Sequence, residues 1–190
     1  MLAFGKLGYI MDGVLASLQL THCYVIALDL PAAKDTLERA LEGLRKTSSQ
    51  WNWGRGHGAA ANGAVAELEG DAASARDYYQ QAIVFLQHCK AFDEETEVHV
   101  RAGHLALSHG ESAVALRHFV VASIIECRDK TIVNYAMGLN DLADVLVAEE
   151  QFLTALSVAR AVLPSLNAMR LTGETARALM RLGSLSLSGE

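Results

Sequence analysis

Residues 63–82 read GAVAELEGDAASARDYYQQA, and residues 103–122 read GHLALSHGESAVALRHFVVA. The second stretch repeats the first at one constant shift, that from Gly63 to Gly103, in five places: a small residue, a turn glycine, an alanine, an aromatic residue and a second alanine. A fixed period of this size predicts a solenoid of stacked helix pairs. The matching positions are Gly63, Gly70, Ala75, Tyr79 and Ala82 in the first stretch and Gly103, Gly110, Ala115, Phe119 and Ala122 in the second.

The composition favours helices around a buried core. Of the 190 residues, 51% are hydrophobic, 20% are charged and only 2 are proline. A chain of this length buries a sizeable core, and its alanine and leucine content favours helix throughout. The net charge of −6 leaves no basic surface of the kind that binds phosphate backbones. We therefore expect no direct nucleic-acid binding by this segment.

Neither a secretory signal nor a membrane span is predicted. The uncharged stretch from Gly13 to Leu28 has only 16 residues, fewer than the roughly 20 that cross a bilayer, so we interpret it as a core helix. Cys23, Cys89 and Cys127 lie far apart and form no Cys-x-x-Cys pair. This spacing favours buried thiols in a reducing compartment over a disulfide framework. We expect a cytoplasmic location and no membrane contact.

The repeat pattern divides the chain into helix pairs within one predicted domain, residues 1–190. Asp71 follows the turn glycine and is expected to cap the next helix, whereas Leu28 and Glu150 replace that glycine in the first and fourth pairs. Residues 1–12 would form a capping or remnant helix, and Lys90 to Glu95 a loop. The predicted units are residues 14–46, 51–89, 93–128, 131–168 and a partial unit over 172–190.

Each small residue has a mechanical explanation. Gly63 and Gly103 let the first helix of a pair approach its partner closely, because glycine has no Cβ. We expect Tyr79 and Phe119 to fill the space near the following repeat.

The five repeated positions resemble those of the tetratricopeptide repeat (TPR), although the period, roughly 40–42 residues, exceeds the usual 34. The resemblance implies an all-α fold: a right-handed α-solenoid of antiparallel helix pairs with about 9–10 helices. Long-period arrays of this kind are similar to those of bacterial LuxR-type transcriptional activators, of peptide-sensing repeat regulators and of the kinesin light chain.

The resemblance also implies a binding surface, because the first helix of each TPR pair lines a concave groove. Carrying the groove positions over gives a mixed polar set. An ordinary solvated polar face is the alternative interpretation of these residues. The basic and amide set that clamps a peptide carboxylate in chaperone-binding members is missing. The candidate ligand-facing residues are Glu97, Arg101, His104, Asn140, Asp141, Asp144 and Arg181.

No catalytic, metal or cofactor site is predicted. His99, His104 and His109 are five residues apart, a spacing that turns around a helix and does not align on one face. Asp141 and Asp144 could approach one another, but no nucleophile accompanies them.

The glycine-rich run at residues 54–58 lacks the preceding strand of a nucleotide site. It is better interpreted as a loosely wound helix start, with Trp51 and Trp53 anchoring the junction between the first two pairs.

The leading hypothesis is a non-enzymatic module that binds a protein or peptide in its groove, as the sensor or scaffold part of a bacterial regulator. The alternative is a structural homo-oligomerisation module without a separate ligand. An apolar chain with an unfinished terminal repeat would leave an exposed end that a homodimer covers.

Overall fold

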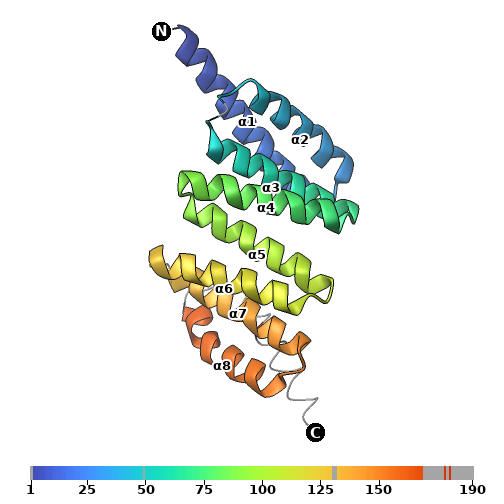
Figure 1. Ribbon diagram of the computed structural model, residues 1–190, viewed down its shortest axis with the longest axis vertical. Coiled ribbons are helices and arrows are strands. Elements are labelled where there is room, and N and C mark those ends of the chain that lie inside the picture. The colour runs from blue at the N-terminus through green and yellow to red at the C-terminus, as the bar shows by residue number, and fades with distance from the viewer. Residues whose placement is uncertain (1, 49, 130–131, 169–177, 179, 181–190) are drawn as a thin grey trace. The chain divides into compact units, whose positions relative to one another are not determined.

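All regular structure in the described residues is α-helical. The computed structural model describes residues 2–48, 50–129, 132–168, 178 and 180, and the helices of each pair are joined by short turns (Figure 1). The all-α prediction is confirmed. The predicted partial unit over 172–190 lies outside these residues, apart from Ala178 and Met180. The helices are α1 (Leu2–Ile26), α2 (Leu30–Arg45), α3 (Asn52–Glu69), α4 (Ala72–Cys89), α5 (Phe92–Ser108), α6 (Ser112–Asp129), α7 (Ile132–Ala148) and α8 (Phe152–Ala168).

The helices group into two compact units, Met1–Val98 and His99–Glu190. In the N-terminal unit α1 packs on α2, both contact α3, and α3 pairs with α4. In the C-terminal unit α6 packs on α7 and α7 on α8. The boundary falls within α5, whose continuous helix contributes residues to both units. The sequence-based division into repeat units stays a prediction.

The first helix differs from the prediction. Residues 1–12 do not form a separate capping helix, because α1 runs without interruption from Leu2 to Ile26. Gly13 is exposed and no atom lies within 4 Å of a Cβ built there. A glycine in a helix costs about 1 kcal/mol relative to alanine but does not end the helix as proline does. Figure 1 shows the first turns of α1 extending beyond the other helices of the N-terminal unit.

The turn between α3 and α4 forms as predicted. Gly70 has φ +80°, the left-handed conformation that glycine adopts without strain. Its N–H donates to the Glu67 carbonyl, and the Asp71 N–H donates to the Ala66 carbonyl. This is the Schellman arrangement, which satisfies carbonyls at the helix end. The Asp71 side chain then caps α4 by accepting from the Ser74 N–H at 3.1 Å.

The same turn recurs where the sequence has no glycine. Leu28, Lys90 and Glu150 also adopt left-handed conformations, with φ between 57° and 58°. The two Schellman hydrogen bonds form at each of these residues and at Gly110. The predicted loop from Lys90 to Glu95 is therefore wrong: Lys90 and Ala91 form a tight turn, and α5 begins at Phe92. The turn within a helix pair and the turn that follows α4 are of one kind.

In the pairs α3–α4 and α5–α6, an aromatic ring packs against a glycine. A Cβ added at Gly63 would lie 2.6 Å from the Tyr79 ring, and one added at Gly103 would lie 2.6 Å from the Phe119 ring. Both rings are almost completely buried. The close approach is confirmed, but each aromatic packs on the glycine of its own pair, where we expected it to fill the space near the following repeat.

Each unit has its own buried apolar cluster that joins its helices. In the N-terminal unit Val14, Leu37 and Val65 belong to one buried cluster that joins the first three helices. In the C-terminal unit Phe119 and Val145 belong to another, which joins α6 to α7. Among the described residues, no helix is both long and apolar enough to cross a bilayer.

Candidate functional site

Three predicted site residues lie along one face of α5. Glu97, Arg101 and His104 are spaced by four and three residues, which aligns them on a helix. Glu97 is exposed and belongs to the N-terminal unit; Arg101 and His104 are half-buried and belong to the C-terminal unit. The helical spacing therefore brings a cation and a titratable ring to neighbouring positions.

The structure brings His104 and Asp141 together. His104 Nε2 lies 3.5 Å from Asp141 Oδ1, a contact between α5 and α7. The two side chains differ in exposure, at 39% for His104 and 4% for Asp141. The His104 ring also meets the Phe119 ring edge-on, with centroids 5.2 Å apart. The histidine is thus held between an aromatic ring and a buried carboxylate while one side stays open to solvent.

The remaining predicted residues on α7 differ in accessibility. Asp144 is half-buried, but Asn140 is completely buried, with 0% of its surface exposed. Because α7 contacts both α6 and α8, much of its surface faces helices. Asn140 therefore lies in the interior of the unit, whereas Arg101, His104 and Asp144 keep part of their surface exposed. Arg181 lies outside the described residues.

A second histidine contact was not foreseen. His99 Nδ1 and His118 Nδ1 are 3.0 Å apart, across α5 and α6. Burial, and next the nearby His118, lower the pKa of His99 to about 4. Burial also lowers the pKa of His118, helped by the Arg117 charge. Both rings are therefore neutral near pH 7, and one can donate to the other. The repeat pattern gave no signal for this pair, since the corresponding positions of the second helix pair hold Ala59 and Tyr78.

In the N-terminal unit, an aromatic cluster joins α3 to the start of α5. Trp53 Nε1 donates to Glu94 Oε1 at 2.8 Å, and the Trp53 and His57 rings have centroids 4.2 Å apart. Burial lowers the pKa of His57, although Glu94 opposes this effect. Trp51 packs on the cluster of the first three helices. The tryptophans connect helices: Trp51 packs at the first three helices as expected, and Trp53 reaches α5 through Glu94.

Within the described part of the chain, no three His, Cys, Asp or Glu side chains converge as a metal would require.

Comparison with known proteins finds similarity in the fold. No family model and no curated protein sequence matches the chain. Among solved structures, it is similar to the nearly identical TPR-like repeats assigned to a kinesin light chain of Podosopora anserina, with a TM-score of 0.67 and 15% identity over 90% of this chain and 87% of that one. It is also similar to BtubC (BKLC) from P. vanneervenii, with a TM-score of 0.70 and 12% identity over 96% of this chain and 82% of that one.

These similarities extend over most of each chain, and at such low identity they concern the fold. They confirm the predicted fold class, including its likeness to kinesin light chain repeats. A similarity to LuxR-type activators is not shown by these structures. The chain has the all-α fold of TPR-like helical-repeat solenoids.

Proposed function

We propose that the chain binds a protein or peptide through the surface of α5 and α7 formed by Arg101, His104 and Asp144. The observation that supports this proposal most strongly is the His104–Asp141 contact. It fixes a half-exposed ring above a buried carboxylate, so the orientation of the ring is set before a ligand arrives. Preorganised side chains lose less conformational entropy on binding than free ones.

The charges on this surface favour a ligand of mixed polarity. Arg101 offers a planar guanidinium, which suits a carboxylate or a backbone carbonyl. Asp144 offers an acceptor for an amine or amide, and His104 offers both roles. A peptide presents all of these groups along its backbone and side chains. TPR-like architecture is consistent with such a ligand, because in tetratricopeptide repeats the first helix of each pair lines a concave face.

Charge reversal tests this proposal. The double variant Arg101→Glu and Asp144→Arg keeps the net charge but inverts the pattern, and Arg76→Glu with Asp77→Arg does the same on the exposed face of α4. Each protein serves as bait in quantitative affinity capture from its native cells. We expect a set of partners that is retained by the unmodified chain and by the α4 control and lost by the α5–α7 variant, at equal helicity and melting temperature. Equal capture by all three baits would contradict the proposal.

The role of the module in a larger assembly rests on the sequence resemblance alone. We propose that the module is the sensor or scaffold part of a bacterial regulator, that it is cytoplasmic, and that it performs no catalysis. A partner recovered from the capture experiment and belonging to a signalling or transcription complex would support this role. A metabolic enzyme would contradict it.

A second candidate function is self-association, and a specific observation favours it. On α6, four apolar side chains that recur on one helix face are exposed: Leu116, Val120, Val121 and Ile124. A contiguous exposed apolar surface marks an interaction site more often than chance.

Light scattering over a dilution series tests this candidate. The self-association function predicts a dimer that Val120→Lys with Ile124→Lys converts to a monomer. A monomeric unmodified chain at high concentration would exclude it.

A further inference from the structure

An open pocket of about 290 Å³ lies in the N-terminal unit, between α2 and the helix pair α3–α4. Its volume is near the lower limit of the roughly 300–1,000 Å³ typical of small-molecule sites. It therefore suits a single side chain better than a cofactor. The residues that line it come from one face of each helix: Lys34, Leu37, Glu38, Leu41, Asn62, Val65, Ala66, Glu69, Asp71, Ser74 and Tyr78.

The pocket combines apolar and acidic lining. Leu37, Leu41 and Val65 are buried or half-buried and supply an apolar surface. Glu38, Glu69 and Asp71 supply three carboxylates, against which Lys34 is the one cation among the described lining residues. The charge of this lining is thus negative by two. Such a surface complements a ligand with a long apolar stem and a cationic end.

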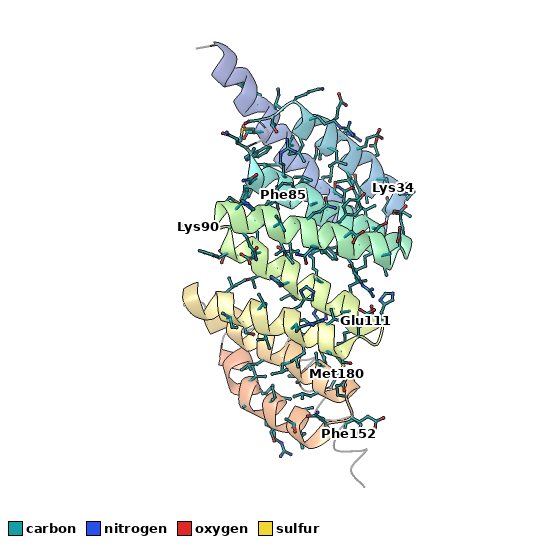
Figure 2. All side chains as sticks on the ribbon, viewed as in Figure 1. Lys34, Phe85, Lys90, Glu111, Phe152 and Met180 are labelled. Carbon is teal, nitrogen blue, oxygen red and sulfur yellow. The ribbon has the colours of Figure 1, made fainter. Side chains whose placement is uncertain are left out.

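Two interactions of the charged lining residues indicate which ligand the pocket would accept. Lys34 Nζ forms an ion pair with Glu69 Oε1, so a lysine of the chain itself demonstrates that an ammonium is accepted at this rim. Figure 2 labels Lys34 on α2. Hydrogen bonds from the Ser74 hydroxyl and backbone N–H lower the pKa of Asp71. Its carboxylate therefore stays ionised at neutral pH and remains a charge that a cation can meet.

We propose that this pocket receives an arginine or lysine side chain of a basic partner segment. The stem lies along Leu37 and Val65, and the cationic head meets Glu38, Glu69 and Asp71, with the Tyr78 ring as a further contact for a cation. Lys34 competes for Glu69, so the ion pair opens when the partner binds. This site lies in the N-terminal unit and is independent of the surface proposed on α5 and α7.

The test uses defined probes and NMR. The blocked tripeptide acetyl-Gly-Arg-Gly-amide is titrated into the uniformly labelled chain, and the same peptide with citrulline is the control, because citrulline keeps the shape of arginine without its charge. We expect saturable shifts at the amides of Asn62, Val65, Ala66 and Tyr78 with arginine and none of comparable size with citrulline. Equal responses to the two peptides, absence of saturation, or shifts spread over the acidic surface would each overturn the proposal.

Two conservative variants sharpen the test without disturbing the core. Glu69→Gln removes a carboxylate and is expected to lower the affinity for the arginine peptide by at least about fivefold. Lys34→Met keeps the apolar stem, removes the competing ammonium and is expected to strengthen binding by about threefold or more. Unchanged affinity in both variants, with the spectrum of the folded chain retained, would exclude the pocket as the site.

Discussion

The second helix pair, α3–α4, and the third, α5–α6, share their interior and differ on their outer face. In both, an aromatic ring packs on a glycine of the partner helix: Tyr79 on Gly63, and Phe119 on Gly103. In both, fully buried alanines follow the turn. The packing of the aromatic ring on the glycine is therefore the same in both pairs, although the surrounding side chains differ.

The outer faces are unlike. The exposed positions of α4 are mostly polar, whereas the corresponding positions of α6 are mostly apolar. Since neither set supports the packing within its pair, these positions are free to diverge. The interior therefore specifies the fold, and the exposed faces distinguish one pair from the next. The corresponding sets are Arg76, Asp77, Gln80, Gln81 and Val84 on α4, and Leu116, Arg117, Val120, Val121 and Ile124 on α6.

The largest expected effect comes from filling the interior. Gly63→Val and Gly103→Val each place a branched side chain where even a Cβ would lie 2.6 Å from an aromatic ring. Overpacking of this kind should lower the free energy of unfolding by about 3 kcal/mol in each pair. Urea denaturation measures the loss.

Gly13→Ala provides the matched control, because nothing lies within 4 Å of a Cβ built at that residue. We expect this variant to be as stable as the unmodified chain or up to about 1 kcal/mol more stable. Similar losses at Gly13 and Gly63 would show that the interior glycines are not packing sites.

Lower pH should weaken the third pair through the His99–His118 contact, which has no counterpart at Ala59 and Tyr78 of the second pair. The pKa of His99 is lowered to about 4 in the folded chain, below its ordinary value of about 6.5. The unfolded chain therefore binds more protons between these values, and stability is lost as the pH falls through this window. We expect about 2 kcal/mol less stability at pH 5 than at pH 7 from this residue.

His99→Gln, which does not titrate, should reduce this pH dependence when urea midpoints are compared. A pH profile that is the same in this variant and in the unmodified chain would contradict the contribution of His99.

Exchanging the two aromatic residues should have a smaller effect. The Tyr79 hydroxyl donates to Glu67 Oε2 at 2.7 Å, and the residue that corresponds to Glu67 in the third pair is Leu107. Tyr79→Phe should cost about 1 kcal/mol, the value of one hydrogen bond. Phe119→Tyr should cost at least as much, because Leu107 offers no side-chain acceptor for the new hydroxyl. Thermal unfolding measures the melting temperatures of the two variants. A higher melting temperature for Phe119→Tyr than for Tyr79→Phe would contradict this expectation.

The smallest expected effect concerns the turns. Leu28 and Glu150 adopt the conformation that Gly70 and Gly110 adopt without strain. Leu28→Gly or Glu150→Gly should therefore stabilise the chain by about 0.5 kcal/mol, since relief of backbone strain exceeds the entropy lost by glycine. Gly70→Ala should have the opposite sign. Differential scanning calorimetry resolves these shifts, and a lower melting temperature for both glycine variants would contradict the interpretation.

The sequence predicts the repeat because glycine, alanine and aromatic residues at fixed spacing have few structural alternatives. It predicts the Asp71 cap for the same reason. The turn at Lys90 could not be predicted, because a lysine in a left-handed conformation has no sequence signature. The continuity of α1 was missed since a single exposed glycine weakens a helix without ending it.

The candidate site was predicted less completely. Helical spacing predicts that Arg101 and His104 share one face of α5, but it could not reveal that Asn140 is completely buried. Burial depends on which neighbouring helices cover a face, and that is a tertiary property. The pocket beside Lys34 was missed because its lining comes from three helices whose residues are distant in the sequence.

We propose that partner recognition occurs on the α5–α7 face and not on the apolar outer face of α6. Site-directed photo-cross-linking in native cells tests it most directly, with p-benzoyl-phenylalanine in place of Arg101 in one protein and in place of Val120 in another. We expect a cross-linked protein or peptide at position 101 that is absent at position 120. A partner, or a second copy of the chain, cross-linked at position 120 and not at position 101 would contradict it.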